Sequence, residues 1–143
     1  MALNLDHLLR TAATLEQALV ELGKVASDTS VLYDLYRNAA IKSFELSLET
    51  SGKLLRKALK AYGGSPRNVD ALVFNEVLRH AGKHGIFDQA AVERWLAYRA
   101  NRNSTAHDYG EEFANKTLKL LPDYLHDVRT LAAKLQEVFD AAS

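Results

Sequence analysis

The stretch Ser30–Gly64, SVLYDLYRNAAIKSFELSLETSGKLLRKALKAYGG, holds a long run of apolar residues at helical spacing, and it decides the fold. Side chains three or four positions apart lie on one face of an α-helix, and paired glycines can supply the left-handed cap that ends it. The stretch therefore predicts one long amphipathic helix whose apolar face must be covered by the rest of the chain. That face consists of Leu32, Tyr36, Ala40, Phe44, Leu48, Leu55 and Leu59.

Four further segments carry apolar residues at the same helical period. Ser65-Pro66 is a helix-start signal for the first of two short middle segments, which Gly82 and Gly85 end, and Asp88 can cap the second. Pro122 predicts a kink or a restart in the last segment. The expected helices cover about residues 5–26, 65–82, 88–102 and 113–139, in addition to the long one.

No segment shows the period-two alternation of a strand, so the chain is expected to be all-α. Long amphipathic helices joined by short turns favour antiparallel neighbours. We predict a five-helix up-and-down antiparallel bundle with a four-helix-bundle-like core, formed by residues 1–143 as a single domain.

Composition narrows the function classes. Lys and Arg together number 18, as do Asp and Glu, so there is no global positive field for nucleic acid and any RNA contact must be local. The absence of cysteine excludes thiolate metal sites and cysteine nucleophiles. No stretch has the roughly 18 apolar residues that a membrane span needs, and the N-terminus lacks a signal-peptide pattern. We expect a cytoplasmic protein with no membrane partner.

Two clusters of charged or ligating residues are weak site candidates. His80 and His84 are four apart, as two metal ligands on a helix would be, but no third ligand is obvious nearby, so we expect no metal and no cofactor. Charged residues also recur three or four positions apart along the long helix, where they form a surface ion-pair ladder or line a polar groove, and Glu49 is retained as a supporting site residue. These residues are Lys42, Glu45, Glu49, Lys53, Arg56 and Lys60.

The strongest candidate is the polar stretch from Arg99 to Tyr109, which includes Arg102-Asn103-Ser-Thr-Ala-His107. Arg102 and His107 are five residues apart, about 140° around an ideal helix, so a helix end between them is needed to bring them together. A guanidinium can grip phosphate oxygens, and an imidazole can exchange protons near neutral pH. The pair suits metal-free RNA cleavage, with a homodimer supplying a second His.

The alternative for this stretch is a polar helix C-terminus. The helix dipole favours Arg and His at that end, and Asn-Ser-Thr readily forms a turn. The residues by themselves leave the two interpretations open.

The motif Arg102-x4-His107-x-Tyr109 resembles that of HEPN domains. Together with Ala40-Ile-Lys-Ser-Phe44-Glu45 and Trp95-Leu96, it is similar to the family of nucleotidyltransferase substrate-binding proteins. One departure is Ser51-Gly52, where relatives commonly carry a large aromatic residue.

The resemblance implies a dimeric helical bundle encoded beside a minimal nucleotidyltransferase. It implies a toxin that is a metal-independent endoribonuclease, with Arg102 and His107 as catalytic residues and Asn103 in support. Arg99 is a supporting residue on other grounds, because with Arg102 it forms the local basic patch on which RNA affinity would depend. Tyr109 matches the residue that the antitoxin partner adenylylates in related toxins. Bulk and negative charge at that position would block RNA.

Two other functions stay open from the sequence. One is a non-enzymatic accessory subunit that binds substrate for a nucleotidyltransferase. The other is a helical interaction module without activity, which would be favoured if Arg102 and His107 were buried in structural hydrogen bonds.

Overall fold

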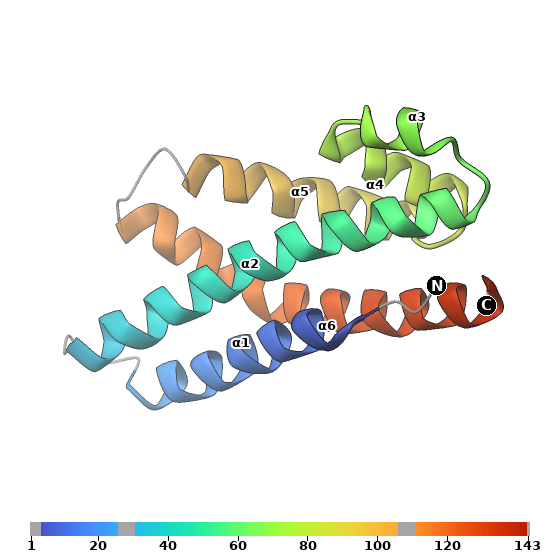
Figure 1. Cartoon of the computed structure of the whole chain (residues 1–143). Helices are drawn as coiled ribbons and strands as arrows, with labels where there is room; N and C mark the ends of the chain where they lie inside the picture. Colours follow the sequence, from blue (N-terminus) through green and yellow to red (C-terminus); the bar gives the residue numbers. More distant parts are fainter. Residues whose placement is uncertain (1–3, 26–30, 106–110, 143) are drawn as a thin grey trace.

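The computed structural model describes the backbone of residues 4–25, 31–105 and 111–142, and the side chains of residues 4–25, 31–102 and 114–141. The described part is helical, with no strand in those ranges (Figure 1). The helices are α1 (Asp6–Lys24), α2 (Val31–Ala61), α3 (Pro66–Asp70), α4 (Phe74–Lys83), α5 (Gln89–Thr105) and α6 (Glu111–Ala142).

The four long helices α1, α2, α5 and α6 alternate in direction, and the short helices α3 and α4 form an excursion at one end of the bundle (Figure 1). The helix α2 packs against α1, α4 and α6, and α5 packs against α4 and α6. The expected all-α class is confirmed. As a result of the alternation, the start of α2 and the end of α5 lie at the same end of the bundle (Figure 1).

The predicted number of five helices is wrong for the described residues, because the expected helix 65–82 is two helices, α3 and α4. The break lies at Val73, whose backbone is extended (φ −76°, ψ 161°). Its N–H donates to Oε1 of Glu76 at 3.1 Å, which satisfies one of the free donors at the start of α4. The Glu76 carboxylate, three residues after Val73, therefore caps the start of α4 and separates α4 from α3.

The glycine cap predicted at the end of α2 is confirmed. Gly63 has φ +90°, in the left-handed region that side-chain-bearing residues rarely adopt. Its N–H donates to the Lys60 carbonyl at 3.1 Å, and the N–H of Gly64 donates to the Leu59 carbonyl at 3.3 Å. These two bonds satisfy carbonyls that the helix end would leave free.

The core is built from one face of each long helix, with an aromatic cluster at its centre. The Trp95 ring contacts Tyr98 and Tyr124 edge-on, and Tyr124 contacts Phe44 in the same way. The Tyr124 hydroxyl and Ser47 Oγ form a buried hydrogen bond of 2.6 Å, which links α2 to α6. The cluster therefore fixes α2, α5 and α6 against one another.

Two details differ from the simplest interpretation of the pattern. Helical structure continues through Pro122, so it marks no restart, and the first part of α6 is inclined to the rest (Figure 1). The first turns of α2 are uncovered: Val31, Leu32 and Leu35 are 82%, 48% and 57% exposed. Leu32 was expected on the buried face, but the buried stripe of α2 begins at Ala40 because the start of α2 projects beyond the core.

None of the described helices is long and apolar enough to cross a membrane.

Candidate functional site

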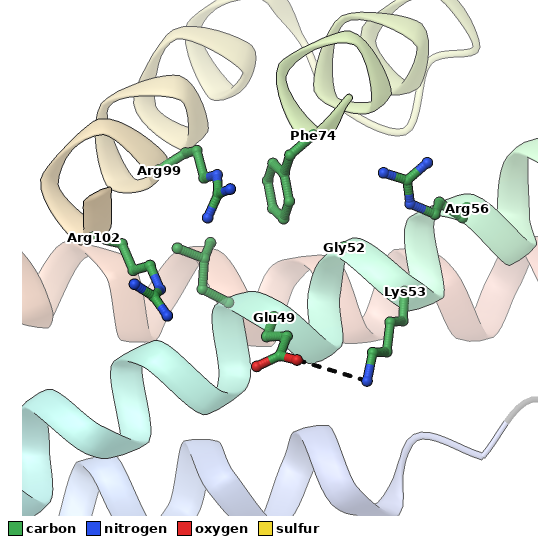
Figure 2. Close-up of a pocket in the computed structure, with 8 residues that line it drawn as sticks. Glu49, Gly52, Lys53, Arg56, Phe74, Arg99 and Arg102 are labelled. Atoms are coloured by element: carbon green, nitrogen blue, oxygen red, sulfur yellow. Dashed lines mark ion pairs between the residues drawn. The ribbon is translucent and has the colours of Figure 1, made fainter. Parts of the chain in front are cut away.

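A basic cleft of about 360 Å³ opens between α2, α4 and α5. In Figure 2 the side chains of Arg99 and Arg102 reach toward α2 from α5, and the Phe74 ring points from α4 toward Gly52. The cleft is lined by Leu48, Glu49, Gly52, Lys53, Arg56, Phe74, Arg99 and Arg102. We call this the basic cleft, because four of its eight lining residues are cationic.

The helix α5 aims Arg99 and Arg102 at the cleft because its neighbouring face is held in the core. Trp95 and Tyr98 are 1% and 4% exposed, which fixes the rotation of the helix about its axis. Arg99 and Arg102, three residues apart, then share the adjoining face. Near the end of α5, Asn101 Oδ1 accepts a hydrogen bond of 2.9 Å from Thr117 of α6.

The two arginines keep their charge unpaired within the described part of the chain. Both are half-buried, and no carboxylate among residues 4–25, 31–102 and 114–141 forms an ion pair with either. The guanidinium of Arg99 lies over the Phe74 ring, with Cζ 4.9 Å from the ring centroid. A cation–π contact holds a guanidinium in place without neutralising it. The guanidinium of Arg102 is therefore not held in a structural hydrogen-bond network by the described residues.

Gly52 stands where the sequence departs from relatives that carry a large aromatic residue, and the structure gives a physical reason for a glycine there. A Cβ atom at this position would lie 2.5 Å from Cε2 of Phe74, which is too close for any real contact. The Phe74 ring of α4 occupies the space beside α2 that a side chain at position 52 would fill. An aromatic group is thus present over α2, but a different helix supplies it.

The charged row of α2 is partly an ion-pair ladder and partly a groove. Glu49 and Lys53 form an exposed pair at 3.7 Å, but Arg56 donates from Nη1 to the Val69 carbonyl at 2.9 Å, and Lys60 pairs with Asp70 at 2.8 Å. Glu49, Lys53 and Arg56 also line the basic cleft. The polar-groove alternative therefore describes this part of α2.

Several residues of the motif fall outside the described part of the structure. His107 and Tyr109 lie in residues 106–110, and the side chain of Asn103 is also outside the described residues. The described helix α5 ends at Thr105, between Arg102 and His107, and α6 begins at Glu111. Whether the helix ends between Arg102 and His107, as their spacing requires, lies outside the described residues. The roles of Arg102, His107, Asn103 and Tyr109 stay predictions.

The ring of His84 has an aromatic neighbour. His84 follows α4, and its ring stacks on Tyr62, with centroids 4.7 Å apart and planes 9° apart. Among the described residues, no three His, Asp or Glu side chains gather as metal ligands would.

Sequence reasoning missed a buried charged network beside the aromatic cluster. Asp127 of α6 is 6% exposed and accepts two bonds from Arg94, from Nε at 2.9 Å and from Nη2 at 3.0 Å. It also accepts a short bond of 2.5 Å from the Tyr98 hydroxyl. Burial, with Asp127 beside the hydroxyl, raises the pKa of Tyr98 above its ordinary range. An acid within the apolar stripe of α6 was the available signal, because Tyr124, Val128 and Leu131 surround it in sequence.

The fold and the cleft define a helical bundle with a basic cleft near the last turn of α5, in which Arg99 and Arg102 form no ion pair with a described carboxylate. A family model described as nucleotidyltransferase substrate binding protein like matches residues 3–137. The chain is 28% identical over 138 residues to a protein of Haemophilus influenzae named "Probable ribonuclease HepT", covering 94% of this chain and 93% of that protein.

Two solved structures share the fold. One is a Haemophilus influenzae protein whose structure is described as revealing the fold of a substrate binding domain of a nucleotidyltransferase. It has a TM-score of 0.81 and 27% identity, and the match covers 93% of this chain and 99% of that one. The other is a Thermus thermophilus protein with a TM-score of 0.65 and 28% identity, covering 85% and 98%. The chain belongs to the nucleotidyltransferase substrate-binding protein family, as its motif predicted.

Proposed function

We propose that this protein is a metal-independent endoribonuclease whose catalytic residues are Arg102 and His107. The observation that carries the proposal is Arg102 itself: a half-buried guanidinium, unpaired among the described residues, in a basic cleft just before the end of α5. The relative named "Probable ribonuclease HepT" supports the same activity.

The chemistry needs two proton transfers at one phosphate. The 2′-oxygen of a ribose loses its proton to His107 and bonds to the adjacent phosphorus, while the bond from phosphorus to the 5′-oxygen breaks. Arg102 stabilises the negative charge that develops on the phosphorane oxygens. The leaving 5′-oxygen needs a proton from a second group, because the His107 imidazole is occupied at the attacking 2′-oxygen.

A homodimer would supply that second group as His107 of a second copy. Three exposed apolar residues in the first turns of α2, namely Val31, Leu32 and Leu35, support this part of the proposal, because exposed apolar side chains that gather on one surface mark interaction sites. They lie at the end of the bundle where α5 ends (Figure 1). A second copy seated there would lie at the same end of the bundle as the last turn of α5, which carries Arg102.

The proposal extends to a toxin–antitoxin pair in the cytoplasm. A minimal nucleotidyltransferase would transfer AMP to the Tyr109 hydroxyl, releasing pyrophosphate from ATP. The added phosphate, two residues along the chain from His107, would add bulk and negative charge and oppose RNA binding. In this scheme Asn103 supports the orientation of His107, and Arg99 and Glu49 belong to the substrate cleft.

A specific observation favours a second candidate, the accessory subunit. The family description and one structural relative both name substrate binding for a nucleotidyltransferase. In that function the basic cleft would hold the phosphates of a nucleotide, and the chain would have no activity of its own.

The test is cleavage of total RNA by the purified protein in EDTA, with wild type compared with Arg102→Ala and His107→Ala. We expect cleavage by the wild type, and a loss of at least about 100-fold in each variant, because each removes a group that acts on the reacting phosphate. Lys134→Ala is the control, since this lysine of α6 does not line the basic cleft. A folded, unmodified wild type without cleavage would exclude the ribonuclease and leave the accessory subunit.

A further inference from the structure

The basic cleft extends well beyond Arg102 and holds cations that the proposed reaction does not use. Lys53 and Arg56 of α2 line it, and so does Arg99 of α5. Catalysis at a single phosphate needs Arg102 alone among the cations of the cleft. The remaining three therefore need a separate explanation.

Contacts that leave positive charge intact position two of these three cations. Arg56 is fixed by a backbone carbonyl, that of Val69, and Arg99 by the Phe74 ring. Lys53 has a carboxylate partner, Glu49, but the pair spans 3.7 Å and its side chains are 73% and 63% exposed, so water screens it. The cleft thus keeps its positive charge although the chain as a whole has a net charge of zero.

The base of the cleft depends on a close fit. Gly52 lets the Phe74 ring lie against α2, and the ring in turn carries Arg99 (Figure 2). A charged ladder on an open helix surface would need no such fit. The arrangement holds α2 cations and α5 cations on opposite sides of one opening of about 360 Å³, which is large enough for a nucleotide-sized group.

We propose that Lys53, Arg56 and Arg99 form a second phosphate-binding subsite, which holds a backbone phosphate of single-stranded RNA next to the phosphate at Arg102. The proposal rests on the proposed function in one respect, that the ligand is RNA. The subsite contacts phosphate and not base edges, so it adds affinity without sequence preference. It also explains how a chain of zero net charge could hold a polyanion.

The test separates a built subsite from general electrostatics. Lys53→Ala is compared with Lys134→Ala, a matched control in which the lysine is also paired with a glutamate at 3.7 Å but lies on α6, outside the cleft. Both variants remove one positive charge. The probe is a fluorescently labelled, fully 2′-O-methylated RNA oligonucleotide, which cannot be cleaved because its 2′-oxygen carries no proton. Binding is measured by anisotropy over a series of salt concentrations.

We expect Lys53→Ala to weaken binding about 3- to 10-fold and to reduce the slope of log affinity against log salt by about 0.7, the value for one contact to single-stranded phosphate. Lys134→Ala should leave both quantities within about 1.5-fold of wild type, because a distant exposed charge is screened. Equal effects of the two substitutions would overturn the subsite. So would binding of ATP with the same dependence on Lys53 while the RNA probe does not bind.

This experiment does not depend on cleavage. If natural RNA is not cleaved but Lys53→Ala selectively weakens binding of the probe, the subsite stands and the ribonuclease proposal fails. If natural RNA is cleaved and the two lysine variants bind alike, the subsite alone fails.

Discussion

The buried carboxylate of Asp127 should be worth more to stability than any of the surface ion pairs, and the structure allows its contribution to be worked out. Asp127→Ala removes the acceptor of the Tyr98 hydroxyl, which lies in a residue that is 4% exposed. A buried donor left without a partner costs about 1–3 kcal/mol. The guanidinium of Arg94 loses two bonds as well, but its side chain is 46% exposed and regains water, so it adds at most about 1 kcal/mol.

Alanine also has a higher helix propensity than aspartate, by about 0.6 kcal/mol, which offsets part of the loss in α6. Together these contributions give a net destabilisation of roughly 0.5–3.5 kcal/mol, with a central value of about 2 kcal/mol. For a chain of this length, a loss of about 2 kcal/mol lowers Tm by roughly 7 °C. Chemical denaturation followed by circular dichroism at 222 nm measures the change, at one fixed protein concentration so that any oligomerisation contributes equally.

A double-mutant cycle with Tyr98→Phe tests the reason for the loss. Tyr98→Phe removes the hydroxyl, so Asp127→Ala in that background leaves no unsatisfied donor in the core. The two substitutions together should therefore cost about 1–2 kcal/mol less than the sum of their separate effects. Additivity within about 0.5 kcal/mol would refute the reasoning, because it would mean that Asp127 and the Tyr98 hydroxyl do not depend on each other.

Three further predictions follow from particular contacts. Burial raises the pKa of Tyr98 and Tyr124 in the folded state above the unfolded value of about 10. Below about pH 10 both tyrosines are protonated in both states and their contribution to stability is fully present. Above about pH 10 the unfolded state loses protons first, so the free energy of unfolding falls by up to about 2.7 kcal/mol per pH unit for the two groups together. Alkaline denaturation should show this fall, and Tyr124→Phe should halve its slope. Gly52→Ala should destabilise the fold by about 1–2 kcal/mol, because its methyl group displaces the Phe74 ring. The control Gly23→Ala, which has open space, should raise stability by up to about 1 kcal/mol, and the reverse order in thermal melts would contradict this account. Leu35→Lys should convert the proposed dimer to a monomer in light scattering without loss of helix content, because this side chain is 57% exposed in the single chain; a wild type that is already monomeric would exclude the dimer.

Local periodicity was enough to locate the four long helices and to predict that they alternate in direction. The apolar stripe of α2, its glycine cap at Gly63 and the polar stretch after Arg102 are each defined by residues close to one another in sequence. They could therefore be predicted from the sequence directly. The division of 65–82 into α3 and α4 was missed, because the hydrogen bond from Val73 to Glu76 competes with a helix that the apolar spacing also allows.

The candidate site also contains some residues that the sequence indicated and others that only the folded structure brought together. The motif from Arg102 to Tyr109 was visible in the sequence because its members are contiguous. The basic cleft was not, because Phe74 meets Gly52 only after α4 folds back over α2. The burial of Asp127 against Arg94 and Tyr98 likewise joins residues of two helices, α5 and α6. The sequence by itself determined the helices and the candidate motif, because these depend on neighbours along the chain. Only the tertiary structure decided which charges are buried, which are unpaired and which share a cleft, because those properties depend on how separate helices pack.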